Sequence, residues 1–518
     1  MNRGALILLA VLLAGALLRL PDLAVRPMHT DEAVHAVKFG TLLESGDYRY
    51  DPYEYHGPTL NYLTLIPAWM GGVHTYAALQ EWHLRIVPAV SGILLLALFF
   101  LFDPHRARWP LWAAVLAAVS PAMVFYSRYY IQEMVLVFFT LGFVAGIYRS
   151  MQARSRGWAM FTGVAAGLMF ATKETSVITF GVIGAAGIVV WLMHRQRGVR
   201  SALPPLAHWL IAGASAFIVI IVFYSSFGRN PRGVLDAFGT FAVYVERAGT
   251  TGRHLHPWYY YLQMLGWSHA PDGRLWTEAG ILLFAGAGFV RAWKERFVVN
   301  DPAAAFRVTT AIATLLMLAI ISVMPYKTPW VMLTALLGLI IMAGSGIETF
   351  LAGADRMRVV RFMLVAGIVI HLGWEAWSAS FAYADRPGNP YVYAHPTGDV
   401  VEIGKAVTAL AAAAPSPISV VVCYQDGDYW PMPWYLRTIA QTGWWSSVPD
   451  SLPRADVVLV SPELESSVTK ALYERSAPGE RPLYVTLFSR PAYVRPGREI
   501  RVYTTLALRE LGQRAGGK

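Results

Sequence analysis

Residues 156–200, RGWAMFTGVAAGLMFATKETSVITFGVIGAAGIVVWLMHRQRGVR, contain the pattern that decides the fold. Two apolar runs, at 158–172 and 176–193, are separated only by the polar segment Thr172–Thr175, and arginines stand outside both runs. Each run is close to the roughly 17–25 apolar residues that a helix needs to cross a bilayer. The stretch therefore predicts a hairpin of two membrane-spanning helices.

The same kind of apolar run recurs along the chain and predicts a polytopic α-helical membrane protein with about eleven transmembrane helices. Hydrophobic residues make up 55% of the 518 residues and charged residues only 15%, against about 25% charged in an ordinary soluble domain. No small-residue cleavage site follows the first run, which we interpret as an uncleaved helix. The runs lie at 4–20, 85–102, 110–126, 131–148, 158–172, 176–193, 208–224, 277–293, 308–324, 329–348 and 361–381.

Basic residues mark every second loop between these runs. Cytoplasmic loops of membrane proteins carry an excess of lysine and arginine, so the alternation predicts a plasma-membrane protein with a cytoplasmic N-terminus. An odd number of spans then places the C-terminal part outside the cell. The net charge is +10, but no nucleic-acid-binding motif accompanies it. The basic loop residues are Arg106, Arg108, Arg149, Arg154, Arg156, Arg195, Arg197, Arg200, Arg291, Lys294, Arg296, Arg356, Arg358 and Arg361.

A fall in hydropathy after residue 381 divides the chain into two predicted domains. Residues 1–381 form the membrane domain, with long external loops at 21–84 and 225–276. Residues 382–518 form a small extracytoplasmic α/β domain. Short β-branched runs predict two of its strands and an amphipathic pattern predicts a helix. These elements are expected at Ile418–Tyr424, Asp456–Ser461 and Asp399–Ala413, respectively.

The first external loop contains the sequence His29-Thr30-Asp31-Glu32-Ala-Val-His35. If this stretch is helical, Asp31 and His35 lie on one face of the helix. One interpretation is a surface helix that Thr30 caps and whose first-turn acids suit the helix dipole. The other is a carboxylate held at the membrane surface as a general base or a metal ligand. The spacing alone leaves both interpretations open.

Charged side chains also border the apolar runs at the ends that are predicted to lie outside. Glu133 begins a very apolar run, where an acid indicates a cavity or a bound cation, unless it only favours the helix start. Lys173 and Lys327 lie in short turns and could hold a phosphate. A self-neutralising Lys173–Glu174 turn and a snorkelling Lys327 are the structural alternatives. Tyr326 precedes Lys327 and could grip the same anionic head group.

Histidines form another class of candidates, as metal ligands. His254 and His256 are a pair in the second long loop, and His56 follows Glu54 in the first. Two histidines alone do not complete a zinc site. A membrane-interface aromatic belt and a Gly-Pro turn explain the neighbouring residues as well. The single cysteine, Cys423, excludes an intramolecular disulfide and a multi-cysteine metal site.

The order of these motifs resembles that of the GT-C glycosyltransferases, which use polyprenyl-phosphate sugars. They include the protein O-mannosyltransferases and the aminoarabinose transferases of lipid A. Closer still, the chain resembles the archaeal flippase-activity-associated family. The resemblance covers most of residues 1–381. It rests on Asp31-Glu32, His56-Gly-Pro-Thr-Leu-Asn-Tyr62, Glu81-Trp-His-Leu-Arg85-Ile-Val-Pro88, Tyr126-Ser-Arg128 with Glu133, Thr172-Lys173-Glu174, His254-Leu-His256-Pro-Trp-Tyr-Tyr-Tyr261 and Tyr326-Lys-Thr-Pro329.

The resemblance implies a GT-C fold and a role for each of these residues. In such enzymes an acid of the first loop is the catalytic base or a metal ligand, and Asp31, followed by Glu32, matches it. A second acid before the fourth span matches Glu133. Departure of the donor phosphate needs cations. The candidates for binding it are Arg128, Lys173, Tyr326 and Lys327.

The resemblance also implies a divalent metal, with zinc, manganese or magnesium as candidates. The aminoarabinose transferases carry Glu-Lys-Pro-Pro where this chain has Tyr55-His56-Gly57-Pro58. The lysine is absent and Glu54 is one place off, so either His56 replaces a family ligand or no metal binds there. His254 and His256 are the other candidate ligands.

The predicted function is transfer of a sugar, with inversion, from a polyprenyl-phosphate donor in the bilayer to an extracytoplasmic acceptor. The alternatives are a flippase or polysaccharide-export transporter without transferase activity, and a structural membrane subunit. Transporters commonly show internal repeats and polar groups near the bilayer midplane. This chain has no evident repeat, and its acids fall in external loops, which favours the enzyme.

Overall fold

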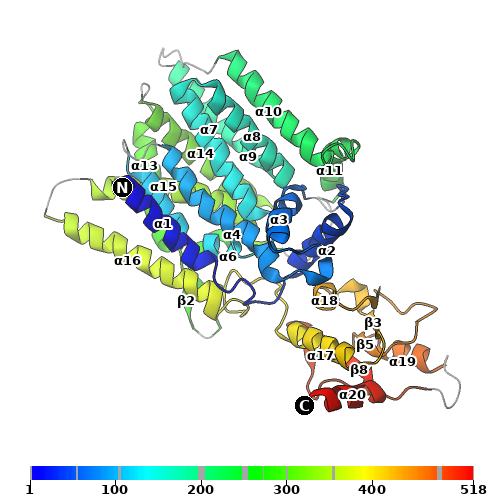
Figure 1. The fold of residues 1–518 in the computed structure, drawn as a ribbon. Helices are drawn as coiled ribbons and strands as arrows, with labels where there is room; N and C mark the ends of the chain where they lie inside the picture. The colour runs from blue at the N-terminus through cyan, green and yellow to red at the C-terminus, as the bar shows by residue number, and fades with distance from the viewer. Residues whose placement is uncertain are drawn as a thin grey trace. The chain divides into compact units, whose positions relative to one another are not determined.

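The computed structural model describes residues 3–53, 56–102, 107–196, 205–247, 255–271, 273–298, 301–352, 356–474 and 481–516. The chain divides into two compact units (Figure 1). Unit 1 comprises Met1–Leu23, Gly46–Pro67 and Trp82–Tyr393. Unit 2 comprises Ala24–Ser45, Ala68–Glu81 and Ala394–Lys518.

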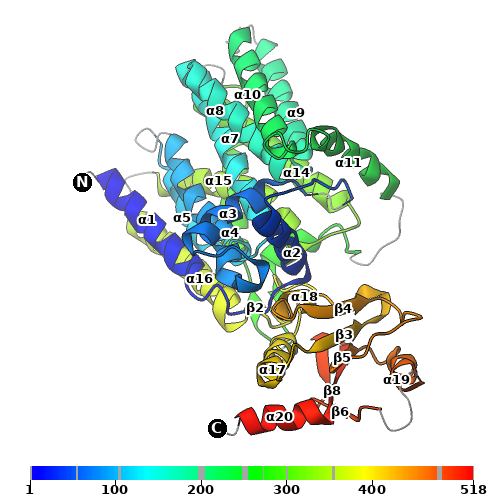
Figure 2. The same cartoon turned by 45° about the vertical axis from the view of Figure 1, so that its right-hand side comes forward.

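Helices form nearly all of the described part of unit 1, and α7, α8 and α10 pack side by side in it (Figures 1 and 2). Its α-helices are α1 (Arg3–Arg19), α3 (Thr59–Met70), α4 (Glu81–Leu98), α5 (Trp109–Val119), α6 (Pro121–Tyr126), α7 (Glu133–Ala153), α8 (Arg156–Thr172), α9 (Ser176–Arg195), α10 (Leu206–Tyr224), α11 (Gly233–Arg247), α12 (Tyr260–Gly266), α13 (Ala279–Glu295), α14 (Pro302–Val323), α15 (Leu333–Leu351) and α16 (Arg358–Trp377).

Each of the eleven predicted apolar runs contains a helix, but the third run is divided. The helix α5 ends at Val119, and the short α6 begins at Pro121. Proline has no N–H to continue the hydrogen-bond ladder of α5, but it fits the first position of a new helix. The Ser120 side chain caps that new helix by accepting a bond from the Met123 N–H.

Seven helical segments of the described residues are long and apolar enough to cross a membrane. The count of about eleven spans stays a prediction, because α1, α8 and α13 have 17 residues each and α5 has 11. The seven segments are Glu81–Phe102, Glu133–Ala153, Ser176–Arg195, Leu206–Tyr224, Pro302–Val323, Pro329–Leu351 and Arg358–Ala382.

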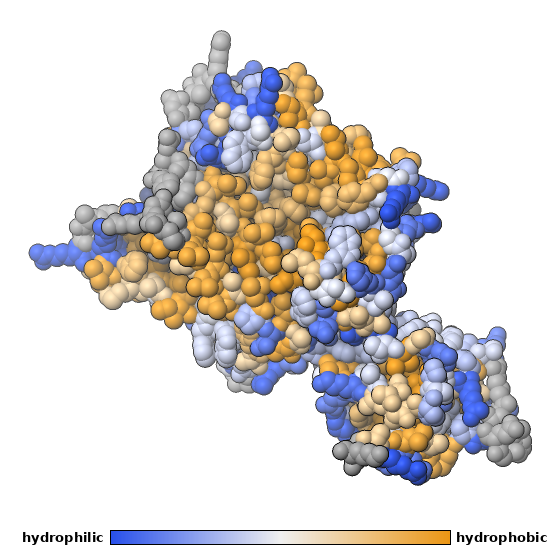
Figure 3. Space-filling model, in the orientation of Figure 1, coloured by the Kyte–Doolittle hydropathy of each residue, from blue (hydrophilic) through white to orange (hydrophobic). Residues whose placement is uncertain are grey.

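A broad apolar surface covers the helices of unit 1 in Figure 3. Only 6% of the apolar stretch of α10 is buried, and only 22% of that of α16. In the segment that contains α15, 83% of the apolar stretch is buried. An exposed apolar surface of this extent needs lipid rather than water around it. The chain is therefore a multi-span membrane protein in which α15 is central and α10 and α16 face outward.

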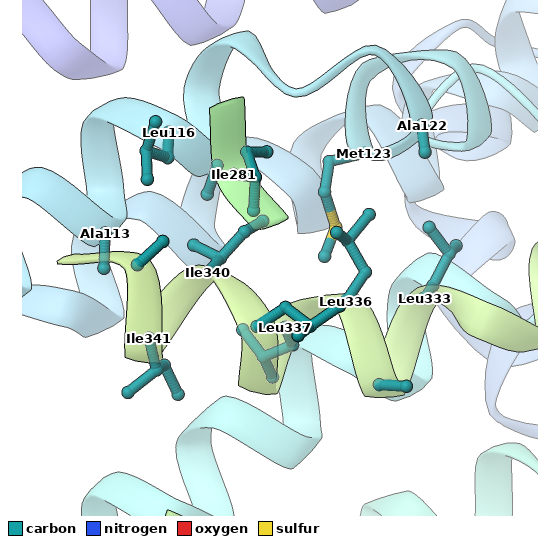
Figure 4. Close-up of a cluster of buried hydrophobic side chains, with 14 of the residues drawn as sticks. Ala113, Leu116, Ala122, Met123, Ile281, Leu333, Leu336, Leu337, Ile340 and Ile341 are labelled. Atoms are coloured by element: carbon teal, nitrogen blue, oxygen red, sulfur yellow. The ribbon is translucent and has the colours of Figure 1, made fainter. Parts of the chain in front are cut away.

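The core of unit 1 is built around α15 (Figure 4). Leu336 and Ile340 of this helix are completely buried and meet apolar side chains of α5, α6 and α13. Helices α13 and α15 approach closely: a Cβ atom on Gly346 would lie 1.9 Å from the Phe284 carbonyl oxygen. Small residues at such contacts let helix backbones meet in membranes.

Two glutamates, Glu348 of α15 and Glu278 at the N-cap of α13, bind the two ends of α5. At one end the Glu348 carboxylate accepts bonds from the Trp109 N–H (3.2 Å) and from Arg291 (2.6 Å). At the other end the Glu278 carboxylate accepts the Ser120 hydroxyl (2.6 Å). The start of α5 and the end of α13 therefore lie at the same end of this helix group. The orientation in the membrane stays a prediction.

Unit 2 is built on a mixed β-sheet with the strand order β4-β3-β5-β8-β6, and β7 pairs with β8. The strands β4 and β5 run parallel to β3, and the other pairs are antiparallel. Helices lie on both faces, which confirms the α/β expectation. The elements are α17 (Asp399–Ala413), β3 (Ser419–Cys423), α18 (Met432–Tyr435), β4 (Gln441–Trp445), β5 (Val457–Val460), α19 (Glu465–Glu474), β6 (Tyr484–Thr486), β7 (Ala492–Arg495), β8 (Arg498–Thr505) and α20 (Leu506–Gly516).

Alternation along β3 and β5 gives the sheet its two apolar faces. Val422 and Leu459 belong to the cluster that includes α17, whereas Val421 and Val458 belong to the cluster that includes α19. All four side chains are at least 98% buried, which explains why these strands are short and continuously apolar.

Unit 2 also contains parts of the first long loop, which the sequence placed with residues 1–381. The helix α2 (Thr30–Ser45) and the 3₁₀ turn Tyr76–Ala78 pack together, and α2 also packs on α18. The unit boundary after Tyr393 lies close to the predicted one at 381, but residues 24–45 and 68–81 join the C-terminal part.

Candidate active site

Unit 1 contains a buried ion pair between the start of α7 and the end of α8. The Lys173 Nζ donates to Glu133 Oε1 at 2.5 Å, and both side chains are less than 10% exposed. Glu133 lies in the first turn of α7, where the helix dipole favours a negative charge. Removing one partner of a buried pair leaves an uncompensated charge, so the two side chains hold each other in place.

A second acid–base pair adjoins the first. Glu174 Oε1 lies 3.2 Å from His56 Nδ1, and His56 forms a β-bridge with Lys173. The Gly57 N–H donates to the Thr172 carbonyl oxygen at 3.2 Å. A Cβ atom on Gly57 would lie only 2.1 Å from the carbonyl oxygen of the residue before Thr172, so glycine alone allows this pairing. The structure thus joins two motifs that the sequence left separate.

Tyrosines surround these pairs, and the sequence analysis did not single them out. Tyr50 lies edge-on to Tyr224 with ring centroids 4.8 Å apart, and its hydroxyl is 2.6 Å from that of Thr240. Burial, with the nearby Glu174 charge, raises the pKa of Tyr50. Tyr50 therefore stays a neutral hydroxyl. In the sequence, the one feature that could have pointed to Tyr50 was its position in the first long loop, among aromatic residues that suggested membrane anchoring.

The turn before the 3₁₀ segment Pro329–Met332 forms another buried basic group. Lys327 is 1% exposed, and its Nζ donates to the carbonyl oxygens of His256, at 3.3 Å, and Met324. The His256 ring stacks on Tyr260, with centroids 4.2 Å apart, and its Nε2 lies 3.1 Å from the Tyr393 hydroxyl. Burial lowers the pKa of Lys327, and burial together with Lys327 lowers the pKa of His256.

Tyr326 and Arg128 were the other predicted phosphate-binding residues. The Tyr326 side chain is 54% exposed next to the buried Lys327. Arg128 is 1% exposed, and its guanidinium donates to the carbonyl oxygens of Arg19 (3.0 Å), Pro21 (2.6 Å) and Asp22 (2.8 Å). These contacts favour anchoring of the chain that leaves α1. The phosphate-binding roles of Tyr326 and Arg128 stay predictions.

In unit 2, Asp31 lies in the first turn of α2. The residue at the N-cap is His29 rather than Thr30, because the His29 carbonyl accepts the first helical bond, from Ala33. His29 Nδ1 accepts the Asp31 N–H at 3.1 Å, and Glu32 Oε2 accepts the His29 N–H at 2.9 Å. This reciprocal arrangement is a capping box in which histidine takes the usual place of serine or threonine. The expectation that Thr30 caps this helix was wrong.

The two acids of this turn differ in exposure. The Asp31 side chain is 44% exposed, whereas Glu32 is completely buried and also pairs with Arg26 at 3.3 Å. The Asp31 carboxylate is therefore accessible to a substrate, whereas Glu32 stabilises the turn. The predicted catalytic role of Glu32 stays a prediction. His35 lies half-buried one helical turn after Asp31.

Within the described residues, no three or more His, Cys, Asp or Glu side chains are placed to hold a metal ion. The predicted residues Glu54 and His254 lie outside the described residues. His56 and Glu174 offer two donors. An imidazole with one carboxylate suits zinc or manganese better than magnesium, which takes oxygen ligands. Two donors do not complete a closed zinc site, so water or a substrate phosphate would have to supply the other ligands.

Comparison with known proteins shows which families and folds this chain resembles. Residues 54–228 match the family model of dolichyl-phosphate-mannose-protein mannosyltransferases. The chain is 25% identical over 191 residues to protein O-mannosyl-transferase 1 of Rattus norvegicus, and an equally similar match is the Mus musculus protein. The matched part spans 32% of this chain and a quarter of the length of these relatives.

Two solved structures align over most of the chain. ArnT from Cupriavidus metallidurans bound to undecaprenyl phosphate aligns with a TM-score of 0.62 at 15% identity and covers 98% of each chain. The oligosaccharyltransferase of Archaeoglobus fulgidus aligns with a TM-score of 0.51 at 13% identity, covering 90% of this chain and 70% of its own. The closer likeness to the archaeal flippase-activity-associated family stays a prediction. The predicted fold is confirmed: this chain has the fold of the GT-C superfamily of membrane glycosyltransferases.

Proposed function

We propose that this protein is a membrane glycosyltransferase that moves a sugar from a polyprenyl-phosphate donor to an extracytoplasmic acceptor. The observation that carries the proposal is the buried Lys173–Glu133 pair at the ends of α8 and α7. A lysine buried at a helix end needs a negative partner, and a lipid phosphate is a second anion of the right kind. The undecaprenyl phosphate bound by the ArnT of similar fold supports this donor class.

The proposed reaction is a displacement at the anomeric carbon. The half-exposed Asp31 carboxylate accepts the proton of the acceptor hydroxyl as the new carbon–oxygen bond forms on the face opposite the phosphate. The phosphate leaves with the electron pair of the old bond, and the sugar is inverted. Lys173 stabilises the departing phosphate as a fixed cation, and Lys327 is a second candidate.

Glu133 has a positioning role in this proposal. Its carboxylate fixes the Lys173 ammonium before the donor arrives, which is preorganisation rather than proton transfer. A divalent ion bound by His56 and Glu174 would supply additional positive charge to the phosphate. Transfer that survives complete chelation would remove that ion from the proposal.

The test uses purified full-length protein in proteoliposomes with labelled polyprenyl-phosphate hexoses and pentoses. A transferase releases polyprenyl phosphate, whereas a flippase moves the intact donor between leaflets. Asp31→Asn should bind the donor normally and reduce release by about a hundredfold or more, since it removes the base. Lys173→Met should weaken donor binding instead. Donor movement without release, or near-normal turnover of Asp31→Asn, would contradict the proposal.

A further inference from the structure

The C-terminal part of unit 2 holds the segment that carries Asp31. The Tyr435 hydroxyl, at the end of α18, accepts the Met28 N–H at 2.8 Å. Nearby, the Trp434 indole N–H donates to Glu81 Oε1 at 2.9 Å, and Arg437 donates to the Leu79 carbonyl oxygen at 2.6 Å. One short stretch of the C-terminal domain therefore binds both pieces of the first loop that belong to unit 2.

Backbone N–H groups between this contact and Asp31 are each held by a hydrogen bond. The Met28 N–H is held by Tyr435, the His29 N–H by Glu32, and the Asp31 N–H by His29. Met28 and Glu32 are completely buried, whereas the Asp31 carboxylate is 44% exposed. The C-terminal part of unit 2 thus holds the backbone just before this turn, and the Asp31 carboxylate stays accessible.

The histidine pair adds a second contact between the same segments. The His29 and His395 rings meet edge-on, with centroids 5.8 Å apart, and both are less than 5% exposed. The His29 ring also binds the turn directly, because its Nδ1 accepts the Asp31 N–H. A positive charge on His395 would be repelled by the nearby Arg26, so this contact favours the neutral form of His395.

We infer that Tyr435 is a positioning residue of the transfer reaction. The C-terminal domain then forms part of the catalytic machinery by orienting Asp31, rather than serving only as a separate binding module. This inference rests on the proposed role of Asp31 as the base. The physical reason is that a catalytic group displaced by about 1 Å loses up to a hundredfold in rate.

Tyr435→Phe removes the hydroxyl that accepts the Met28 N–H and keeps the ring. Tyr424→Phe is a matched control, because the Tyr424 hydroxyl also bonds a backbone group, the Glu499 carbonyl at 3.1 Å, away from the first loop. We expect Tyr435→Phe to lower kcat by about tenfold or more with an unchanged donor KM. Tyr424→Phe should leave kcat unchanged at a similar melting temperature. Equal kcat in the two variants would overturn the inference.

Two further measurements separate this inference from the proposed function. If Tyr435 acts through Asp31, Tyr435→Phe should cause no further loss of kcat in an Asp31→Asn background, because the two effects are not independent. Hydrogen exchange of the amides at 28–33 should also quicken in Tyr435→Phe and not in Tyr424→Phe. If exchange is faster in Tyr435→Phe but Asp31→Asn turns over normally, Tyr435 positions the turn and Asp31 is not the base. Unchanged exchange would overturn the positioning role itself.

Discussion

The side chains of Asp31 and its neighbours have separate tasks that their sequence does not distinguish. Asp31 contributes its backbone N–H to the helix cap, and its carboxylate is exposed. Glu32 is buried and bonded to the backbone of the same cap. The Arg128 guanidinium donates to three backbone carbonyl oxygens, although Arg128 lies only five residues before the candidate acid Glu133. Burial and hydrogen-bond partners, rather than residue type, separate a reactive group from a structural one.

The buried His395 predicts a pH-dependent stability. Burial, with the charges of His29 and Arg26, holds its pKa well below 6.5 in the folded protein, despite an opposing effect of Glu32. An unfolded histidine titrates near 6.5. The unfolded state therefore binds more protons below that pH, and the stability that neutral His395 contributes is lost as the pH falls. The melting temperature should drop between about pH 7.5 and 5.5, and His395→Gln should reduce this drop. An identical pH profile in the variant would contradict the prediction.

Among the contacts between elements, the backbone pairing of the first loop with the end of α8 is the one that assembles the candidate site. Thr59 at the start of α3 donates its hydroxyl to the Ala171 carbonyl at 2.6 Å, beside the contact of Gly57. These bonds bring His56 to Glu174 and place Lys173 beside Glu133. The ion pairs of the candidate site thus adjoin a contact between the first long loop and the end of α8.

Gly57→Ala tests that contact. The added methyl would lie 2.1 Å from the Ala171 carbonyl oxygen, so the backbone must shift. We expect a destabilisation of about 1–3 kcal/mol and weaker donor binding, measured by thermal unfolding and by titration with polyprenyl phosphate. Gly181→Ala is a suitable control, because nothing lies within 4 Å of an added Cβ there. A loss of the same size in Gly181→Ala would show that the effect is not specific to the pairing.

For the molecule as a whole, the alternation of basic loops predicts the topology. In a variant background without Cys423, cysteine replaces the exposed Ala153 or Asp450 one at a time. Asp450→Cys should react with an impermeant maleimide on intact cells, and Ala153→Cys only after permeabilisation, because the arginines around Ala153 are predicted to be cytoplasmic. Labelling of Ala153→Cys alone on intact cells would invert the map.

Local patterns in the sequence predicted the elements well. The helix α17 has the predicted bounds Asp399–Ala413, and both predicted strands are present within one or two residues. The apolar runs became helices because hydrophobicity over some twenty residues is a local property that lipid solvation selects directly. The division of the third run at Ser120-Pro121 was missed, although the proline that causes it stands in the sequence.

Only the tertiary structure decided which residues meet. His56 and Glu174 are 118 positions apart, Lys173 and Glu133 are 40 apart, and Met28 and Tyr435 are 407 apart. Such contacts leave no periodic signal, because they depend on how complete helices pack and not on neighbouring residues. The sequence by itself therefore determined the membrane class, the helix positions and the candidate residue types. The grouping of those residues, and the joining of the Asp31 turn to the C-terminal domain, came from packing between distant parts of the chain.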